Sequence, residues 1–446
     1  MRARAIRAVV VGATAVAALG AAVLTAPVAG ATDGSRGGAA RDTGHAATRA
    51  ALEAQVDEAG VPGALAQARD ERGVWNGDAG VANLRTGKPR GEHDRYRIGS
   101  ITKTFTATVL LQLRAEGKVD LDASVDTYLP GVVRGNGHDG RAITVRQLLN
   151  HTSGISNYTA DADFGRTYLG VGFLKHRYDT LTPREAIAIA MRHQPDFEPG
   201  AGWNYSNTNY MLAGLIIEKV TGTPYATQVR QRIIKPLGLR STTLPGTRAG
   251  IPGPHGRGYS KFPDDPRGKI HDTTLLNPSW GWAAGEAIST SADLNRFYAA
   301  LLQGRLLPRA ALAEMKTTVP VGDDVPLRYG LGVAELRLSC DTTVWGHDGG
   351  IPGSSSYAFS SEDARHQIAL NLNADWTGQG MAVVDAEFCG ATDTDAATEG
   401  ATAAASEGAT RADAARGATP KGSEHPVRTV ERGRHGSLAP RVNAAG

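Results

Sequence analysis

Strand-like patterns occur near both ends of the foldable part of this chain, with helical patterns between them, and this order strongly constrains the fold. Near the start, GALAQARDERGVWNGDAGVANLRTG (residues 63–87) is typical of strands joined by polar turns, with Val74 and Val81 on strands. Near the end, strand patterns return in YGLGVAEL, TTVWGHDG, SSSYAFS and HQIALNLNA, before a last helix near MAVVDAEF. Segments such as PREAIAIAMRHQ and NYMLAGLIIEKVTG in between have helical spacing. We therefore expect an α/β fold: an antiparallel sheet formed from both chain ends, flanked by helices, with an inserted, mainly helical lobe.

The first residues are typical of a secretory signal. They combine three arginines with a small-residue apolar stretch and end in Ala29-Gly30-Ala31, which predicts cleavage after about Ala31. A membrane anchor is the alternative, but a stretch dominated by Ala, Val and Gly is poorly suited to remain in lipid. We therefore expect residues 1–31 to be a signal peptide and the mature protein to be secreted (extracellular).

Composition also marks two further segments as lying outside the folded domain. Residues 32–43 are mostly Gly, Ala, Arg and Asp without apolar periodicity, which indicates a linker. Residues 391–446 lack Phe, Trp, Tyr, Met and Ile, and such a segment buries too little apolar surface to offset its ordering entropy. We expect a disordered tail there, and one domain over residues 44–390.

Charge and cysteine content exclude some classes of partner and indicate one crosslink. Lys+Arg number 48 against Asp+Glu 45, and the arginines are dispersed, so we expect no nucleic-acid partner. No segment after the signal has about 18 uninterrupted apolar residues, so no integral membrane segment is expected in the mature chain. In an exported chain the two cysteines, Cys340 and Cys389, favour a disulfide over two separate buried thiols.

The stretch RIGSITKTFTATVLLQL (residues 97–113) raises a question of chemistry. It predicts a buried helix from about Thr102 to Glu116, with Ser100 and Lys103 one turn apart at its start. A serine hydroxyl needs an adjacent base to attack a carbonyl, and a desolvated lysine can lose its proton near neutral pH. Free backbone N–H groups at the helix start would stabilise negative charge beside the serine. The alternative is that Ser100 is an ordinary N-cap and Lys103 is solvated.

Two later segments carry further candidate side chains. In WNYSNTNYMLAG, Tyr205 and Asn207 precede a helix. A tyrosine near a lysine ammonium would have its pKa lowered and could shuttle protons, while the amide could hold a substrate carbonyl or the lysine. The alternative is a turn with an Asn cap and a half-buried tyrosine.

The third segment, TTVWGHDGGIPGSSSYAF, runs from an apolar strand into His347, Asp348, Gly349 and Gly350. The glycines permit close approach of backbone to a ligand, and the Gly350 N–H could form an oxyanion hole with that of Ser100. A polar loop with a solvated histidine is the alternative.

Taken together, Ser-x-x-Lys, Tyr-x-Asn and His-x-Gly in this order, with LLNHTSGI (residues 148–155) and GWAAGEAISTSADLNRF (residues 281–297), carry a resemblance. Over roughly residues 45–390 the chain resembles the penicillin-recognising serine hydrolases, and most of all the soluble Streptomyces-type D-alanyl-D-alanine carboxypeptidases. The same group includes β-lactamases and related esterases. The resemblance implies their α/β fold and an acyl-enzyme mechanism.

The resemblance also implies roles for individual residues. Ser100 would be the acylated nucleophile, Lys103 its proton acceptor and Tyr205 the proton shuttle to the leaving group. Asn207 would hold the substrate amide, and His347 would supply a positive or hydrogen-bonding group on the sheet edge.

The resemblance also implies further substrate-binding residues. Trp282 would be an aromatic lining the cleft, and the others are Asp348, Gly349 and Gly350. No metal and no organic cofactor are needed. The implied partners are a peptidoglycan stem peptide or another small acyl substrate, with β-lactam antibiotics as covalent ligands.

Two residues depart from the pattern of the carboxypeptidases. They hold a terminal carboxylate with a hydroxyl inside or just after the His-x-Gly triplet, where this chain has Asp348 and Gly350. An aspartate would repel an anionic substrate and suit an amine or a neutral ester. The sequence still favours a D-alanyl-D-alanine carboxypeptidase, with an esterase, a D-amino-acid peptidase, a β-lactamase or a penicillin-binding sensor without turnover as alternatives. Neither a G-x-S-x-G elbow nor an H-E-x-x-H pair occurs, which excludes an α/β-hydrolase and that kind of metallohydrolase.

Overall fold

The structure, a computed structural model, describes residues 44–322 and 325–390. The predicted signal peptide, linker and tail (residues 1–31, 32–43 and 391–446) lie outside the described residues, so the predictions for them stay predictions. None of the described helices has the length and apolar character needed to cross a membrane.

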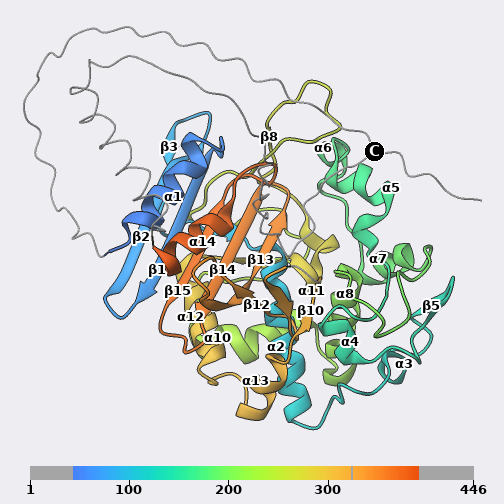
Figure 1. Cartoon of the computed structure of the whole chain (residues 1–446). Coiled ribbons are helices and arrows are strands. Elements are labelled where there is room, and N and C mark those ends of the chain that lie inside the picture. Colours follow the sequence, from blue (N-terminus) through green and yellow to red (C-terminus); the bar gives the residue numbers. More distant parts are fainter. Residues whose placement is uncertain (1–43, 323–324, 391–446) are drawn as a thin grey trace, which may run out of the picture. The chain divides into compact units, whose positions relative to one another are not determined.

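A nine-stranded antiparallel sheet forms the frame of the domain (Figure 1), in the order β10-β11-β12-β13-β14-β15-β1-β2-β3. Its strands are β1 (Gly63–Asp70), β2 (Gly73–Asn83), β3 (Lys88–Pro89), β10 (Val319–Pro320), β11 (Leu327–Tyr329), β12 (Ala334–Arg337), β13 (Thr343–Ile351), β14 (Ser354–Ser361) and β15 (Gln367–Leu372). The first strand pairs with the last, from Ala64 opposite Leu372 to Arg69 opposite Gln367. The prediction of an antiparallel sheet built from both chain ends is therefore confirmed.

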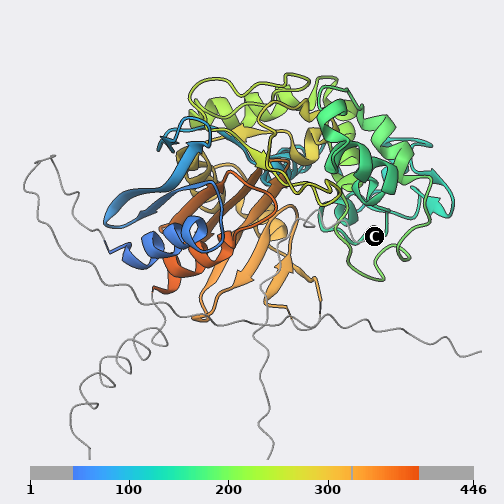
Figure 2. The same cartoon turned by 90° about the horizontal axis from the view of Figure 1, so that it is seen from above.

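Helices cover both faces of this sheet. On one face lie α1 (Ala46–Asp57) and α14 (Gly380–Cys389), which pack against each other, and on the opposite face lies α12 (Ser291–Leu302). Figure 2 shows α1 and α14 together on one side of the strands. Because both faces are covered, β15 is buried at every position, which explains its nearly continuous apolar sequence.

The inserted segment is mainly helical, as predicted. Its helices are α2 (Thr102–Ala115), α3 (Val125–Tyr128), α4 (Val145–Leu149), α5 (Ala162–Phe164), α6 (Phe173–His176), α7 (Pro183–Ala190), α8 (Asn207–Thr221), α9 (Tyr225–Val229), α10 (Lys235–Leu237), α11 (Trp282–Gly285) and α13 (Arg309–Met315). Short two-stranded ribbons join them: β4 (Tyr96–Arg97) with β9 (Ile288–Ser289), β5 (Arg134–Gly135) with β6 (His138–Asp139), and β7 (Tyr259–Ser260) with β8 (His271–Asp272).

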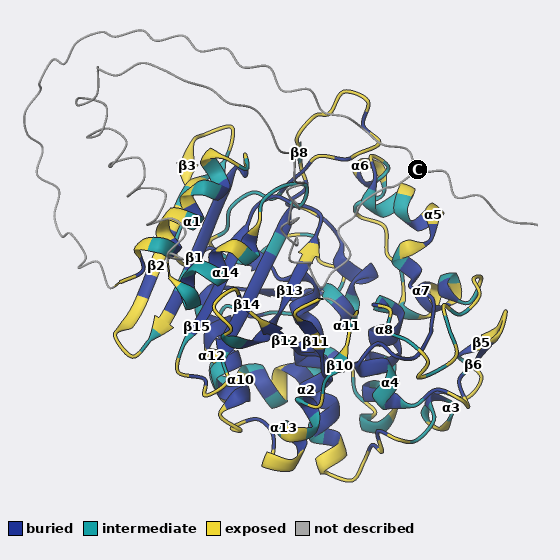
Figure 3. Ribbon diagram, viewed as in Figure 1, coloured by how far each residue is buried: buried dark blue, intermediate teal, exposed yellow. Residues whose placement is uncertain are grey.

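Helix α2 lies at the centre of the molecule. It is buried on all sides along its first ten residues, and only its C-terminal end is exposed (Figure 3). It packs against α8, α9, α11 and α13, so a sequence that is apolar around the whole helix is what its position requires. The helix ends at Ala115, one residue before the predicted end at Glu116, and Gly117 then adopts a left-handed conformation.

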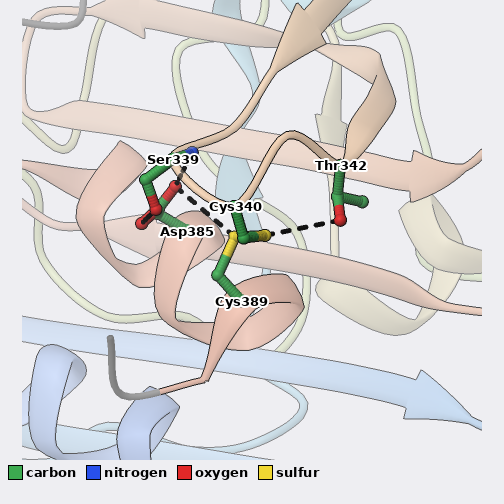
Figure 4. Close-up of a disulfide and its surroundings, with 5 residues drawn as sticks. All are labelled: Ser339, Cys340, Thr342, Asp385 and Cys389. Atoms are coloured by element: carbon green, nitrogen blue, oxygen red, sulfur yellow. Dashed lines mark hydrogen bonds between the residues drawn. A yellow bond between two sulfur atoms is a disulfide. The ribbon is translucent and has the colours of Figure 1, made fainter. Parts of the chain in front are cut away.

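The predicted disulfide between Cys340 and Cys389 is present, with the Cα atoms 5.6 Å apart. It joins the loop between β12 and β13 to the end of α14, and beside it Ser339 donates two hydrogen bonds to Asp385 (Figure 4). The two cysteines are 49 residues apart, and closing a loop of this length stabilises a fold by about 4 kcal/mol on the chain-entropy model.

Candidate active site

The turn before α2 packs backbone against backbone on strand β13. The 3-10 turn Gly99–Ile101 begins with Gly99 at a φ of +50°, where a Cβ atom would lie 2.8 Å from the Gly350 nitrogen. A Cβ atom on Gly349 would lie 2.1 Å from the Ile98 oxygen and 2.7 Å from the Ser100 nitrogen. Only glycine allows this approach, which brings the backbone of Ser100 beside that of Gly350. This is the neighbourhood that the predicted oxyanion hole requires.

The site opens to solvent at Gly350. This glycine is the one exposed position of β13, and nothing lies within 4 Å of where its Cβ atom would be. Strand β12 pairs with β13 only as far as Gly346, so beyond that point the edge of β13 that faces away from β14 pairs with none of the described strands. An extended substrate segment can therefore lie along this edge.

Ser100 lies inside the 3-10 turn and caps no helix with its side chain. The interpretation as an ordinary N-cap is therefore wrong. Its side chain instead faces Lys103, one turn further on, whose Nζ lies 2.9 Å from the Ser100 Oγ.

Lys103 is fully buried and held by three neighbours. Its Nζ donates to the Asn207 Oδ1 at 2.7 Å and to the Ala284 carbonyl at 2.8 Å. Neither of these oxygens can donate a proton, so each accepts one N–H bond of the amine. When the amine is neutral, its lone pair is left to accept from the Ser100 hydroxyl. Burial holds the pKa of Lys103 well below 10.5, against a smaller opposite effect of the Asp348 charge. The side chain is therefore built as a proton acceptor for Ser100.

The ring of Tyr205 lies against the same amine. The distance from the Lys103 Nζ to the ring centroid of Tyr205 is 4.8 Å. The expectation of a lowered tyrosine pKa is wrong: burial raises the pKa of Tyr205 well above 10, and an interaction with Ser100 offsets only part of this. The phenol therefore keeps its proton at neutral pH. In this state it can donate a proton near Ser100, and Lys103 is the group that accepts one.

Asn207 opens α8 and is fixed by two further residues. Its backbone N–H donates to the Asn157 Oδ1 at 3.0 Å, and its Nδ2 donates to the Thr159 Oγ1 at 3.1 Å. Since its Oδ1 accepts from Lys103, the amide orients the base. One N–H of Nδ2 remains for a substrate carbonyl.

His347 is placed differently from the expectation. It is fully buried; the Tyr329 hydroxyl donates to its Nε2 at 2.8 Å, and its Nδ1 donates to the Asp348 carbonyl. Burial, with a smaller effect of Lys103, lowers its pKa to about 3. The expectation of a positive group is therefore wrong, because the ring is neutral and both nitrogens are already bonded. His347 supports the strand beneath the site.

Asp348 follows His347 on β13, so its side chain projects from the opposite face of the strand. Its cross-strand partner on that face is Tyr357 of β14. Its side chain is 3% exposed, and its negative charge raises the pKa of Lys103. A buried carboxylate thus lies two residues from the open position at Gly350.

Trp282 packs against the helical lobe. A Cβ atom on Gly214 of α8 would meet its ring at 2.6 Å, and the ring is in edge contact with Tyr225 of α9, 4.6 Å between centroids. The residue is half-buried, so these contacts account for one part of its surface. Its role as an aromatic lining the cleft stays a prediction.

Several residues that the sequence reasoning did not single out complete the site. The Ala284 carbonyl, Asn157 and Thr159 position Lys103 and Asn207, and nothing in their sequence context signals this. His151, within the LLNHTSGI segment, is fully buried; its ring lies 4.3 Å from that of Tyr205, and its Nδ1 accepts from the Ser206 N–H at 3.2 Å. That segment was noted only as part of a resemblance.

The pH dependence of kcat/KM should show that the negative charge of Asp348 acts on Lys103. As the pH falls through the Lys103 pKa the amine becomes protonated and kcat/KM falls. Because Asp348 raises that pKa, Asp348→Asn should move the acid limb to lower pH. The measurement is kcat/KM for a neutral p-nitrophenyl ester across pH, with the exposed Asp341→Asn as the control. An acid limb that stays in place, or moves to higher pH, would contradict this electrostatic assignment.

Comparison with known proteins agrees with this geometry. The profile of the Beta-lactamase family matches residues 48–385. A D-stereospecific amidohydrolase from Streptomyces sp. is 60% identical in sequence with a TM-score of 0.75, over 78% of this chain and 99% of that one. D-amino acid amidase from Ochrobactrum anthropi SV3 is 30% identical with a TM-score of 0.63, over 74% of this chain and 90% of that one.

Curated relatives are more distant. Penicillin-binding protein 4 of Amycolatopsis lactamdurans is 29% identical over 70% of this chain and 81% of its own length. Penicillin-binding protein 4* of Bacillus subtilis (strain 168) is 26% identical over 67% of this chain, and the match spans 65% of that protein. With the family profile covering most of the chain, and a serine and a lysine in contact at the start of a buried helix, this chain belongs to the Beta-lactamase family of penicillin-recognising serine hydrolases.

Proposed function

We propose that this protein is a serine amidohydrolase that acylates Ser100 with D-amino-acid residues carrying a free α-amine. The observation that carries the proposal is the buried carboxylate of Asp348, two residues before the open position at Gly350, where a carboxypeptidase would have a hydroxyl. A carboxylate there favours an ammonium group and disfavours a terminal carboxylate. The similarity to a D-stereospecific amidohydrolase and to D-amino acid amidase supports an amide substrate of D configuration.

The site supports a complete acyl transfer. The Ser100 Oγ forms a bond to the substrate carbonyl carbon as its proton passes to the Lys103 Nζ, and the Ser100 and Gly350 N–H groups stabilise the oxyanion. The C–N bond then breaks as Tyr205 gives its proton to the leaving amine, and Lys103 returns a proton to Tyr205. A water molecule then attacks the ester carbonyl on Ser100 in the same way, and the C–O bond to Ser100 breaks to release the D-amino acid.

We also infer that the enzyme acts outside the cell. The secretory signal predicted from residues 1–31 supports this, as does the disulfide, a bond typical of oxidising compartments.

The test compares D-phenylalanine amide, its L enantiomer, a diacyl-Lys-D-Ala-D-Ala peptide and a neutral ester. We expect turnover of the D amide that is lost in Ser100→Ala. In Asp348→Asn, kcat/KM should fall roughly 10- to 100-fold on the amide while the ester is spared, the size of one charged hydrogen bond. Faster D-alanine release from the diacyl peptide would overturn the proposal in favour of a carboxypeptidase. Turnover of the ester alone would indicate an esterase, and labelling by a fluorescent penicillin without turnover of any substrate would indicate a sensor.

A further inference from the structure

Behind the turn that carries Ser100 lies a cavity of about 20 Å³ that is strongly basic. Four arginines line it: Arg90, Arg95, Arg97 and Arg257. None of the described residues that line it is acidic. A buried site with this balance of charge is costly unless an anion compensates it.

Arg97 is the least compensated of the four. It comes from β4, three residues before Ser100, and is 3% exposed. Its Nη2 donates to the carbonyls of Ala249 at 2.6 Å and Leu276 at 3.0 Å, whereas its Nε and Nη1 are buried and have no hydrogen-bond partner among the described residues. Among the described residues no carboxylate lies within ion-pair distance of Arg97, and the Glu286 charge acts on it only from farther away, so the N–H groups of Nε and Nη1 remain for a ligand.

Arg90 is engaged mostly by neutral groups. It donates to the Gly63 carbonyl at 3.1 Å and to the Asn371 Oδ1 at 2.9 Å. Its Nε lies 3.7 Å from the Asp94 carboxylate and makes no hydrogen bond within the described residues. Two guanidinium groups on one cavity thus retain unused, buried donors.

The other two arginines are already committed. Arg257 pairs with Asp272 at 3.1 Å, and Arg95 donates to backbone carbonyls of Pro252 and Arg240. Arg95 and Arg257 therefore add positive electrostatic potential to the cavity that they line. Among the described residues that line the cavity, the arginine donors that are both buried and without a partner therefore belong to Arg90 and Arg97.

We propose that this cavity is a binding site for one small monovalent anion of chloride size, held by the free N–H groups of Arg97 and Arg90. The volume is enough for about one water-sized particle, which favours chloride over the larger sulfate and phosphate ions. Such an anion supplies a negative charge that none of the described residues lining the cavity carries.

The site is connected to the nucleophile through hydrogen bonds. The hydroxyls of Ser354 and Ser356 donate to the Arg97 carbonyl at 2.7 and 3.1 Å, and the Asn371 amide, which accepts from Arg90, donates to both hydroxyls. An anion between the two arginines therefore stabilises the backbone that leads into Gly99 and Ser100. This inference is independent of the substrate proposed above.

The experiment measures the unfolding temperature at constant ionic strength while sodium gluconate is replaced by sodium chloride, bromide or sulfate. Chloride and bromide should raise it saturably, by roughly 2 to 5 °C, and sulfate should give no saturable rise. Arg97→Gln should abolish the halide effect, and the exposed Arg365→Gln should retain it.

A crystal grown in sodium bromide provides a second readout that does not depend on the variant folding. An anomalous bromine peak within hydrogen-bond distance of the Arg97 Nε or Nη1 would support the site. An unfolding temperature that does not respond to halide in the unmodified protein, or a bromide map with no peak in the cavity, would overturn the proposal.

Discussion

Replacing Lys103 by Met is expected to slow acylation of Ser100 by roughly 10⁴-fold while the protein stays folded. The amine is the proton acceptor closest to the Ser100 Oγ, at 2.9 Å, and burial keeps its neutral form available. Methionine fills a similar volume, so the packing of α2 is retained while the base is lost. The measurements are the rate of covalent labelling by a fluorescent penicillin and the burst with a p-nitrophenyl ester.

The matched control is Lys118→Met, a lysine just beyond the end of α2 whose side chain is 52% exposed. It should acylate at the rate of the unmodified protein. Circular dichroism and the unfolding temperature establish that both variants are folded. Acylation by a folded Lys103→Met protein within about tenfold of the normal rate would show that another group takes the serine proton.

Tyr205→Phe is expected to lower the hydrolysis of amides by roughly 10²- to 10⁴-fold and to affect an activated ester far less. An amine leaving group must be protonated as it departs, whereas p-nitrophenolate leaves without a proton. The raised pKa of Tyr205 keeps this proton on the phenol at neutral pH, where it is available to the leaving group. The measurement is kcat/KM for a D-amino acid amide and for the p-nitrophenyl ester of the same acyl group.

The control for this variant is Tyr178→Phe, a tyrosine that is 56% exposed. It should leave both activities unchanged. Equal losses on the amide and the ester in Tyr205→Phe would argue against proton donation to the leaving group. They would instead assign the residue a structural role against Lys103, whose amine lies over its ring.

Much of this site follows from spacing within single segments. Ser100 and Lys103 meet because residues three apart share a helix face, and α2 is buried because its apolar residues surround the helix. Gly222, the last residue of the helical pattern NYMLAGLIIEKVTG, ends α8 in a left-handed conformation. Such features depend on local geometry, which the order of residues specifies directly.

Protonation states and side-chain directions do not follow from spacing. Whether His347 is charged depends on burial and on Tyr329, eighteen residues away, whose hydroxyl bonds its ring. Tyr205 lies beside Lys103 as expected, yet desolvation raises its pKa where proximity to an ammonium would have lowered it. Trp282 turned toward α8 because Gly214 leaves room for its ring there.

The sequence by itself therefore determined the antiparallel frame, the buried helix with its serine and lysine, and the disulfide, because each depends on periodicity, local spacing or cysteine number. Only the tertiary structure decided which groups are neutral, which side chains face the substrate edge, and that no described carboxylate lies within ion-pair distance of Arg97. These properties arise from desolvation and from contacts between segments far apart in the chain, and a linear pattern does not contain them.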